Sequence, residues 1–303
     1  QFAWQPQLSP SGPLLVLVSL REQLAYVYRN GLRIGRSSVS TGKKGYETPI
    51  GVFTILQKHQ EHYSNLYDNA PMPFMQRLTW SGVALHAGNV PGYPASHGCV
   101  RLPYAFSELL FGATTTGVTV VIAEGGTAPT LVSGELLATT PAAAAMPDAS
   151  VEWTWHPERA LQGPLTIVLS TRDRRVVVLR DAIEIGRSTV TVTGDAPVGT
   201  TAYMLLEGRT DEPSQIVPGR MALRWMSVSG DGAAAQTAPL AVLASRLAVP
   251  ASFSRQVYDA LTDGTTVVIT DEALRSGEGD SALTILRADA GPGEGAEAGQ
   301  QLP

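Results

Sequence analysis

The sequence predicts a mainly β protein built from two related domains, each a mixed-sheet sandwich with one or two helices. Three observations predict this class. Short apolar or alternating runs rich in Val, Leu and Tyr recur along the chain. Turn residues such as Asn30-Gly31 separate these runs, and Asn and Gly accept the positive φ of a hairpin turn. Short motifs of the first part also recur in the second part.

The first part of the chain is expected to consist mainly of strands. Apolar or alternating runs predict them at residues 14–19, 24–29, 33–40, 52–56, 83–85 and 118–122. One helix is expected over residues 103–111, because Pro103 suits a helix start and Gly112 a stop. Residues 57–79 fit neither period, so we expect a long lid or binding loop there.

The second part of the chain repeats motifs of the first in the same order. Ile34-Gly35-Arg36-Ser37 returns as Ile185-Gly186-Arg187-Ser188, and Pro94-Ala95-Ser96 is echoed by Pro250-Ala251-Ser252. Ala, Thr, Gly and Pro dominate residues 124–150, and acidic and small residues dominate 275–303. We therefore expect a domain at 1–123, a linker at 124–150, a second copy at 151–274 and a disordered tail at 275–303.

Charge and cysteine content limit the classes of protein. The 303 residues carry a net charge of −5, which argues against nucleic acid as a partner. Residues 1–123 have a net charge of +4 and residues 124–303 a net charge of −9, so the basic half suits an anionic ligand. One cysteine excludes an intrachain disulfide. No apolar run reaches the ~20 residues of a membrane-spanning helix.

The stretch from Leu85 to Pro103 concentrates the residues that carry chemistry. It contains the only cysteine, Cys99, and two of the five histidines, His86 and His97. A cysteine nucleophile needs a base to take its proton and backbone N–H groups to hold the oxyanion that develops. The sequence therefore offers Cys99 as nucleophile, His86 and His97 as bases, and the N–H groups of Gly98 and Cys99 as oxyanion donors.

Two other interpretations of these residues are open. Cys99 could be an inert buried thiol, although a loop flanked by His and Gly is a poor place for one. The histidines His59, His62, His86 and His97 could bind zinc with Cys99, but their spacing matches no zinc motif. We therefore expect neither a metal nor another cofactor.

The segment Ser96-His97-Gly98-Cys99-Val100-Arg101 resembles the signature of the L,D-transpeptidase catalytic domain, also called the YkuD domain. Further stretches agree with that family in order, among them Thr48-Pro49-Ile50-Gly51, Met72-Pro73-Phe74-Met75 and Leu85-His86-Ala87-Gly88. The resemblance covers about residues 13–123 and implies the fold of that catalytic domain.

The resemblance implies a reaction on peptidoglycan. Cys99 would attack the third residue of a tetrapeptide stem, release D-Ala, and pass the acyl group to an amine of a second stem as a 3→3 cross-link. His86 matches the upstream base of the family, and His97 would orient the thiol. Carbapenems acylate this family, and its substrate implies a periplasmic or secreted protein.

The expected substrate contacts surround the signature. Arg101 could hold a substrate carboxylate or serve a structural ion pair, and members with a longer gap often carry Asn there. Tyr63 and Met72 could line the substrate groove or simply pack. Ser96 and Tyr93 complete the expected substrate-binding residues.

The second copy is expected to have lost the chemistry. No cysteine or histidine follows His156, and Phe253-Ser254-Arg255 stands after the echoed proline motif. The copy would then cover a sheet edge, bind glycan or dock a partner protein. For the whole chain, hydrolysis by an L,D-carboxypeptidase or amidase and a non-catalytic cell-wall binding role remain the competing functions.

Overall fold

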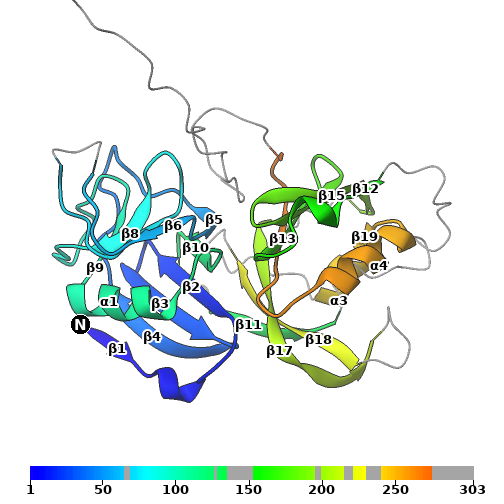
Figure 1. The fold of residues 1–303 in the computed structure, drawn as a ribbon, viewed down its shortest axis with the longest axis horizontal. Coiled ribbons are helices and arrows are strands. Elements are labelled where there is room, and N and C mark those ends of the chain that lie inside the picture. Colours follow the sequence, from blue (N-terminus) through cyan, green and yellow to red (C-terminus); the bar gives the residue numbers. More distant parts are fainter. Residues whose placement is uncertain are drawn as a thin grey trace, which may run out of the picture.

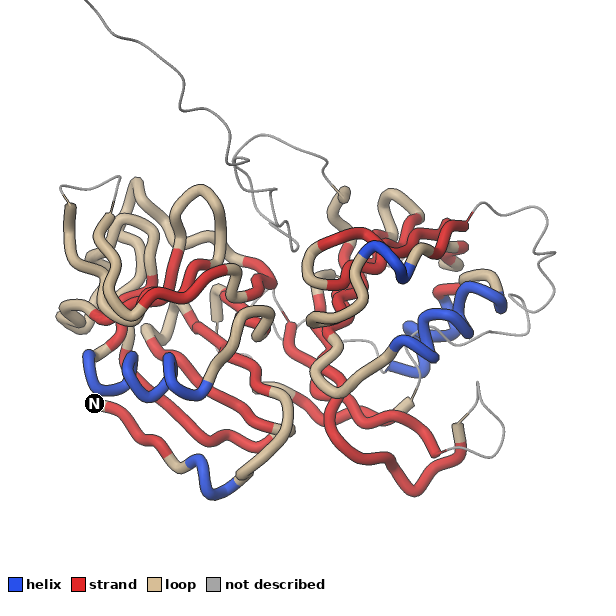
Figure 2. The backbone as a smooth tube through the Cα atoms, in the orientation of Figure 1, coloured by secondary structure: helices blue, strands red, loops and turns tan. Residues whose placement is uncertain are grey.

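The structure is a computed structural model that describes residues 1–64, 69–125, 128–134, 153–194, 199–214, 221–229 and 240–274. Two halves lie side by side in it (Figure 1). Strands are the main regular element of both halves and helices are few (Figure 2). The predicted mainly β class with mixed sheets is confirmed.

The first half is centred on a six-stranded sheet in the order β1-β4-β3-β2-β10-β5. The side chains of β2 and β10 are nearly all apolar. Because successive side chains of a strand point to opposite sides, this sheet has two apolar faces. Val16 and Val120 belong to the core within the first half, whereas Leu17 and Val121 face the second half. The strands are β1 (Phe2–Trp4), β2 (Leu14–Ser19), β3 (Leu24–Arg29), β4 (Leu32–Ser38), β5 (Gly51–Thr54) and β10 (Thr119–Ala123).

A smaller sheet and a helix complete the first half. The sheet has the order β6-β7-β8-β9, with β6 (Gln57–His59), β7 (Met75–Arg77), β8 (Ala84–Ala87) and β9 (Val100–Leu102). Residues 57–79 are thus not one irregular loop, since β6 and β7 pair within them. Helix α1 (Tyr104–Ala113) runs past the expected stop at Gly112. Its Phe106 and Leu110 join the same core as the smaller sheet.

The second half is centred on an eight-stranded sheet in the order β11-β18-β17-β20-β13-β14-β15-β12. A two-stranded pair, β16 (Thr191–Val192) with β19 (Leu247–Ala248), and the helices α3 (Leu240–Arg246) and α4 (Ala251–Ala260) accompany it. The strands are β11 (Thr130–Ser133), β12 (Trp153–Trp155), β13 (Leu165–Ser170), β14 (Arg175–Arg180), β15 (Ile183–Thr189), β17 (Thr201–Pro213), β18 (Met221–Ser229) and β20 (Thr266–Thr270). Short 3-10 turns, η1 (Pro6–Leu8) and η3 (Pro157–Arg159), follow β1 and β12.

The two large sheets share one strand order. The series β12-β15-β14-β13-β20-β17 has the same connectivity as β1-β4-β3-β2-β10-β5. The repeated Ile-Gly-Arg-Ser motif has a packing reason. A Cβ on Gly35 would lie 2.8 Å from the Trp4 ring, and one on Gly186 would lie 2.5 Å from the Trp155 ring. Glycine is therefore needed in both sheets to seat a tryptophan.

The structure corrects the equivalence expected for Pro250. Pro250 caps α4 with φ −54° and ψ 140°, and Pro103 caps α1 with φ −55° and ψ 141°. Pro250 therefore corresponds to Pro103 and not to Pro94. Counting back from these caps, Arg246 directly precedes β19 as Cys99 directly precedes β9. By this count Arg246, and not Arg255, stands as far before a capping proline as Cys99 does.

The two halves share an apolar layer. From the first half it includes Leu15, Leu17 and Val121, and from the second Met204 and Val268. The layer joins β2 and β10 to β17, β18 and β20, and Figure 1 shows β17 and β18 on the side of the second half that faces the first. The second half therefore covers a sheet face of the first.

Part of the expected linker belongs to a sheet. Thr130–Ser133 forms β11, which pairs antiparallel with β18 at the edge of the eight-stranded sheet. The apolar Leu131-Val132 pair explains why a strand forms within an otherwise small and polar segment. Residues 135–152 and the expected tail 275–303 lie outside the described residues.

Candidate active site

A cavity of about 660 Å³ lies between the smaller sheet, the loop after β8 and the start of α1. Part of its wall comes from residues proposed from the sequence, namely Met72, His86, Ser96, His97, Cys99 and Arg101. Strand β8 carries His86, and the parallel strand β9 follows Cys99 and pairs Arg101 with His86. Parallel pairing of β8 with β9 thus brings the imidazole and the thiol to one cavity.

His86 is held as a neutral imidazole. Its Nδ1 lies 2.8 Å from the Ala87 carbonyl oxygen. Because a carbonyl oxygen only accepts, Nδ1 carries the proton and Nε2 keeps its lone pair. Burial lowers the pKa of His86 to about 4, with smaller contributions of the same sign from Arg101 and His62 and an opposing one from the Ala87 hydrogen bond. His86 therefore has the protonation state of a general base at neutral pH.

Cys99 is a half-buried thiol. Its Sγ donates to the Gly82 carbonyl oxygen at 3.4 Å. Burial raises the pKa of Cys99, while a hydrogen bond from the Ala84 backbone and the charges of Arg101 and Arg77 act in the opposite direction. Because burial outweighs these contacts, the resting group is a protonated thiol that needs a base to become a nucleophile.

The hydroxyl of Ser96 closes the loop that carries the thiol. Its Oγ donates to the Cys99 carbonyl oxygen at 2.5 Å and accepts from the Gly98 N–H at 3.2 Å. Gly98 has φ +105°, a conformation that favours glycine. The Gly98 N–H expected as an oxyanion donor is thus already bonded to Ser96. Ser96 is 1% exposed, so its hydroxyl holds the loop and does not reach out to a substrate.

His97 and Arg101 have further contacts at the cavity wall. The His97 ring packs edge-on against Tyr46, with ring centroids 4.6 Å apart. The Arg101 side chain lies against Gly88, where a Cβ would come within 3.1 Å of it, and its Nη1 donates to the Ala95 carbonyl oxygen at 3.4 Å. Arg101 thus borders the cavity with its stem fixed on one side.

The aromatic residues expected in the groove lie elsewhere. Tyr63 is 54% exposed and bridges to Pro71, and Tyr93 is 61% exposed with its carbonyl oxygen accepting from Ser40. Neither residue is among those that line the cavity, and their contact with a substrate stays a prediction. Met72 does line the cavity and is buried.

Other lining residues were not singled out from the sequence. Gly82 contributes a backbone carbonyl, which leaves no signal in a sequence. Tyr104 lies at the start of α1 and packs edge-on against Phe74 at 5.2 Å. Tyr104 directly follows Pro103, the predicted start of the helix, and this position could have indicated from the sequence that Tyr104 lies near the site. Asn89 lines the cavity from the loop after β8.

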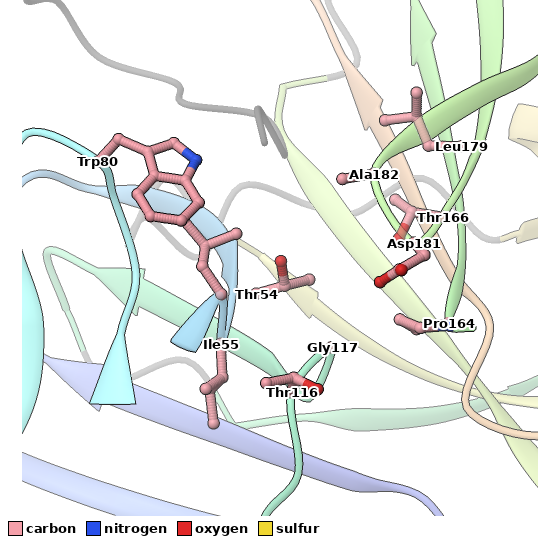
Figure 3. A pocket seen from close by; sticks show the side chains of 11 residues that line it. Thr54, Ile55, Trp80, Thr116, Gly117, Pro164, Thr166, Leu179, Asp181 and Ala182 are labelled. Carbon is pink, nitrogen blue, oxygen red and sulfur yellow. The ribbon is translucent and has the colours of Figure 1, made fainter. Parts of the chain in front are cut away.

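A second, smaller cavity of about 110 Å³ lies between the halves (Figure 3). Trp80 borders it on one side, and Pro164 and Asp181 border it on the other. Its wall contains no cysteine, histidine or lysine. The thiol and the imidazoles His86 and His97 therefore lie at the larger cavity and not at this one.

The described part of the chain has neither a metal-binding cluster nor a helix that could cross a membrane. No three side chains of His, Cys, Asp or Glu come together there in a metal-binding group, and His59 and His62 stack on each other at 5.9 Å. Among the same residues no helix is long and apolar enough to cross a bilayer.

Comparison with protein families identifies the domain that contains this site. Residues 13–122 match the family model of the YkuD domain, described as the L,D-transpeptidase catalytic domain. These residues therefore carry a YkuD-type domain, as the resemblance predicts. No match was found among curated proteins.

Solved L,D-transpeptidases resemble part of the chain. One from Stackebrandtia nassauensis is 31% identical, with a TM-score of 0.34, over 38% of this chain and 56% of its own. L,D-transpeptidase 1 from Mycobacterium tuberculosis is 29% identical, with a TM-score of 0.32, over 37% of this chain and 62% of its own. A third, in complex with imipenem, is 26% identical, with a TM-score of 0.35, over 37% and 60%. The chain thus spans about three fifths of the length of these relatives.

Proposed function

We propose that this protein is a peptidoglycan L,D-transpeptidase that works through a thioester on Cys99. The observation that carries the proposal is the His86 imidazole, which is neutral, has Nε2 unprotonated, and shares a cavity with the only thiol of the chain. A buried neutral base beside a protonated thiol suits acyl transfer, in which the proton moves as the bond forms.

The proposed reaction has two stages. In the first, His86 Nε2 takes the Cys99 proton while Sγ attacks the carbonyl carbon of the third residue of a tetrapeptide stem. The amide C–N bond breaks, the proton passes to the departing amine, and D-Ala leaves. In the second, an amine of another stem attacks the thioester, the C–S bond breaks, and the thiol is restored as the 3→3 cross-link forms.

Two features of the cavity support a peptide-stem substrate. Arg101 supplies a fixed cation that can hold a stem carboxylate. The cavity is large enough for an extended peptide and is lined by apolar groups such as Met72 and Tyr104. A substrate in the cell wall would place the protein in the periplasm or outside the cell.

Water competes with the amine for the same thioester. The alternative function is therefore an L,D-carboxypeptidase or amidase, in which water takes the place of the amine. A non-catalytic cell-wall binding role is less favoured, because it leaves the neutral His86 and the thiol at one cavity without a purpose.

We further propose that residues 151–274 are a degenerate copy of the first domain and take no part in the chemistry. The shared strand order and the matching helix caps at Pro103 and Pro250 support a common origin. Arg246 takes the place of Cys99, and its Nε donates to the Thr193 carbonyl oxygen at 2.9 Å. An arginine cannot form a thioester, so this copy serves to cover the first domain.

The test of this function is product analysis with purified tetrapeptide murein fragments. The full chain should yield D-Ala and cross-linked dimers, whereas tripeptides alone would show hydrolysis and overturn the transfer step. Cys99→Ala should lower product formation by at least about 10³-fold, because the nucleophile itself is removed.

The matched control is Arg246→Gln, which changes the corresponding position of the second half. Turnover should match that of the unmodified chain. If Cys99→Ala keeps its activity, or if Arg246→Gln abolishes it in a folded protein, the assignment of the single active site is wrong.

A further inference from the structure

The loop between β4 and β5 holds the thiol-bearing loop in place through Thr48. Thr48 is 4% exposed, and its Oγ1 accepts from the Gly42 N–H at 2.8 Å. The same oxygen donates to the Gly98 carbonyl oxygen at 2.9 Å. A single buried hydroxyl thus joins two loops that are 50 residues apart in sequence.

The Gly98 carbonyl belongs to the peptide unit whose N–H is that of Cys99. A trans peptide is planar, so its C=O and N–H point in opposite directions. The chain has no cis peptide bond among its described residues. A hydrogen bond that fixes the Gly98 carbonyl therefore also fixes the direction of the Cys99 N–H. Gly98 and Cys99 each have a backbone N–H, and that of Gly98 is bonded to Ser96. Of these two donors, the Cys99 N–H is therefore the one that can donate to an oxyanion.

The loop that carries Thr48 is itself rigid. The Lys43 N–H donates to the Ser96 carbonyl oxygen at 3.0 Å, and the Ala95 N–H donates to the Thr41 carbonyl oxygen at 3.0 Å. A Cβ on Gly42 would lie 1.9 Å from the Tyr46 carbonyl oxygen, so the chain can close this tightly only at a glycine. Thr48 is therefore held firmly enough to set the orientation of a neighbouring peptide.

We propose that Thr48 is a positioning residue for acyl transfer, whose hydroxyl aims the Cys99 N–H at the oxyanion of the tetrahedral intermediate. This inference rests on the proposed function, because only an acyl substrate forms such an oxyanion. Thr48 does not touch the substrate. It acts through the Gly98–Cys99 peptide.

The test compares two reactions of the same thiol on the full chain. Imipenem acylates a nucleophilic cysteine through a tetrahedral oxyanion, whereas iodoacetamide alkylates it by direct displacement at a saturated carbon and forms none. Intact mass spectrometry gives the rate of each. Thr48→Val keeps the shape of the side chain but removes the hydroxyl, so it separates the two chemistries.

Thr48→Val should slow acylation on the order of 10- to 100-fold, because outright loss of an oxyanion donor costs about 10²–10³-fold and here the donor is only misdirected. Alkylation should be unchanged. Thr48→Ser should restore acylation, because it keeps the hydroxyl. Thr114→Val is the matched control, since Thr114 is equally buried and its Oγ1 donates to Gln76 at 2.7 Å, away from the thiol loop. It should leave the ratio of the two rates unchanged.

The outcomes separate the two proposals. Equal slowing of both reactions by Thr48→Val, or of neither, overturns the role of Thr48 while the unmodified chain is still acylated. If the unmodified Cys99 is alkylated but neither accepts an acyl group from imipenem nor turns over murein fragments, the proposed function fails, and the role of Thr48 fails with it.

Discussion

At the scale of single residues, burial decides the state of the two reacting groups. His86 is 6% exposed, and burial penalises its charged form, so the ring stays neutral well below pH 7. Burial acts on Cys99 in the opposite sense, raising the pKa of the thiol because the thiolate is its charged form. The resting pair is thus thiol and imidazole, and not thiolate and imidazolium.

This resting state predicts the pH dependence of thiol reactivity. Between about pH 6 and pH 8, His86 does not titrate, because its pKa is about 4. Cys99 stays mostly protonated, and its thiolate fraction rises about tenfold for each pH unit. The rate of alkylation by iodoacetamide should rise in proportion across this range without levelling off. When the series is continued above pH 8, the rate in concentrated urea should level off near the pKa of an ordinary thiol, whereas that of the folded chain should level off at higher pH, because burial raises the pKa of Cys99. A folded chain that levels off at a lower pH than the unfolded one would contradict this assignment.

At the scale of elements, the end of α1 supports the strand that carries His86. Helix α1 packs against β8, and the last carbonyl groups of a helix have no partner within it. Lys58, on β6, is a hydrogen-bond donor for such carbonyl groups. Its Nζ donates to the carbonyl oxygens of Phe111 at 2.6 Å and Thr114 at 2.5 Å. The same ammonium lies 4.3 Å from the centre of the Phe111 ring. The helix end is therefore held by the smaller sheet.

Removing this contact should destabilise the first half. Lys58→Met keeps most of the stem but loses both hydrogen bonds, and each such bond from a charged group contributes about 1.5–3 kcal/mol. The urea midpoint, followed by circular dichroism, should fall. Lys44→Met is the control, because Lys44 is an exposed lysine of the same half. Equal midpoints for the two variants would show that Lys58 does not stabilise α1.

At the scale of the whole molecule, the two halves share a core. Leu17 and Val121 of the first half pack in one apolar layer with Met204 and Val268 of the second. Thr119 and Thr266 are the first residues of β10 and β20, and a hydrogen bond of 2.6 Å joins their hydroxyls. Unfolding of either half would expose the apolar face of the other, so we expect the halves to unfold as one cooperative unit.

Coupling between the halves can be measured at the thiol. Met204→Ala removes a side chain that is 2% exposed and should cost about 2–5 kcal/mol. Because the core is shared, the urea concentration at which Cys99 becomes open to alkylation should fall, although Cys99 is in the other half. Met221→Ala, at a 49% exposed site on β18, should have little effect. The shared core is refuted if Met204→Ala lowers the urea midpoint followed by circular dichroism but leaves that of Cys99 alkylation unchanged.

The sequence by itself determined many of the strands and the residues able to do chemistry, while the repeat that it indicates stays a prediction. Short apolar or alternating runs are a local pattern, so a run such as 14–19 predicts a strand wherever the rest of the chain lies. The only thiol and the two histidines of the signature region stand within one short stretch, residues 86–99, so Cys99 and His86 could be proposed without coordinates. The correspondence of Pro250 with Pro103 could not, because Pro250-Ala251-Ser252 is identical to Pro94-Ala95-Ser96, whereas Pro103 is followed by Tyr104, and only the helix caps pair Pro250 with Pro103.

Only the tertiary structure decided how those residues are held. The Nδ1 proton of His86 follows from a carbonyl 2.8 Å away, and the contact of Thr48 with Gly98 spans 50 residues of sequence. Tyr63 and Tyr93, although close in sequence to the site, were placed outside the cavity by the paths of their loops. Periodicity is fixed by neighbouring residues and is visible in a sequence. Hydrogen-bond partners and burial depend on which distant segments meet, and that is fixed by packing of the whole chain.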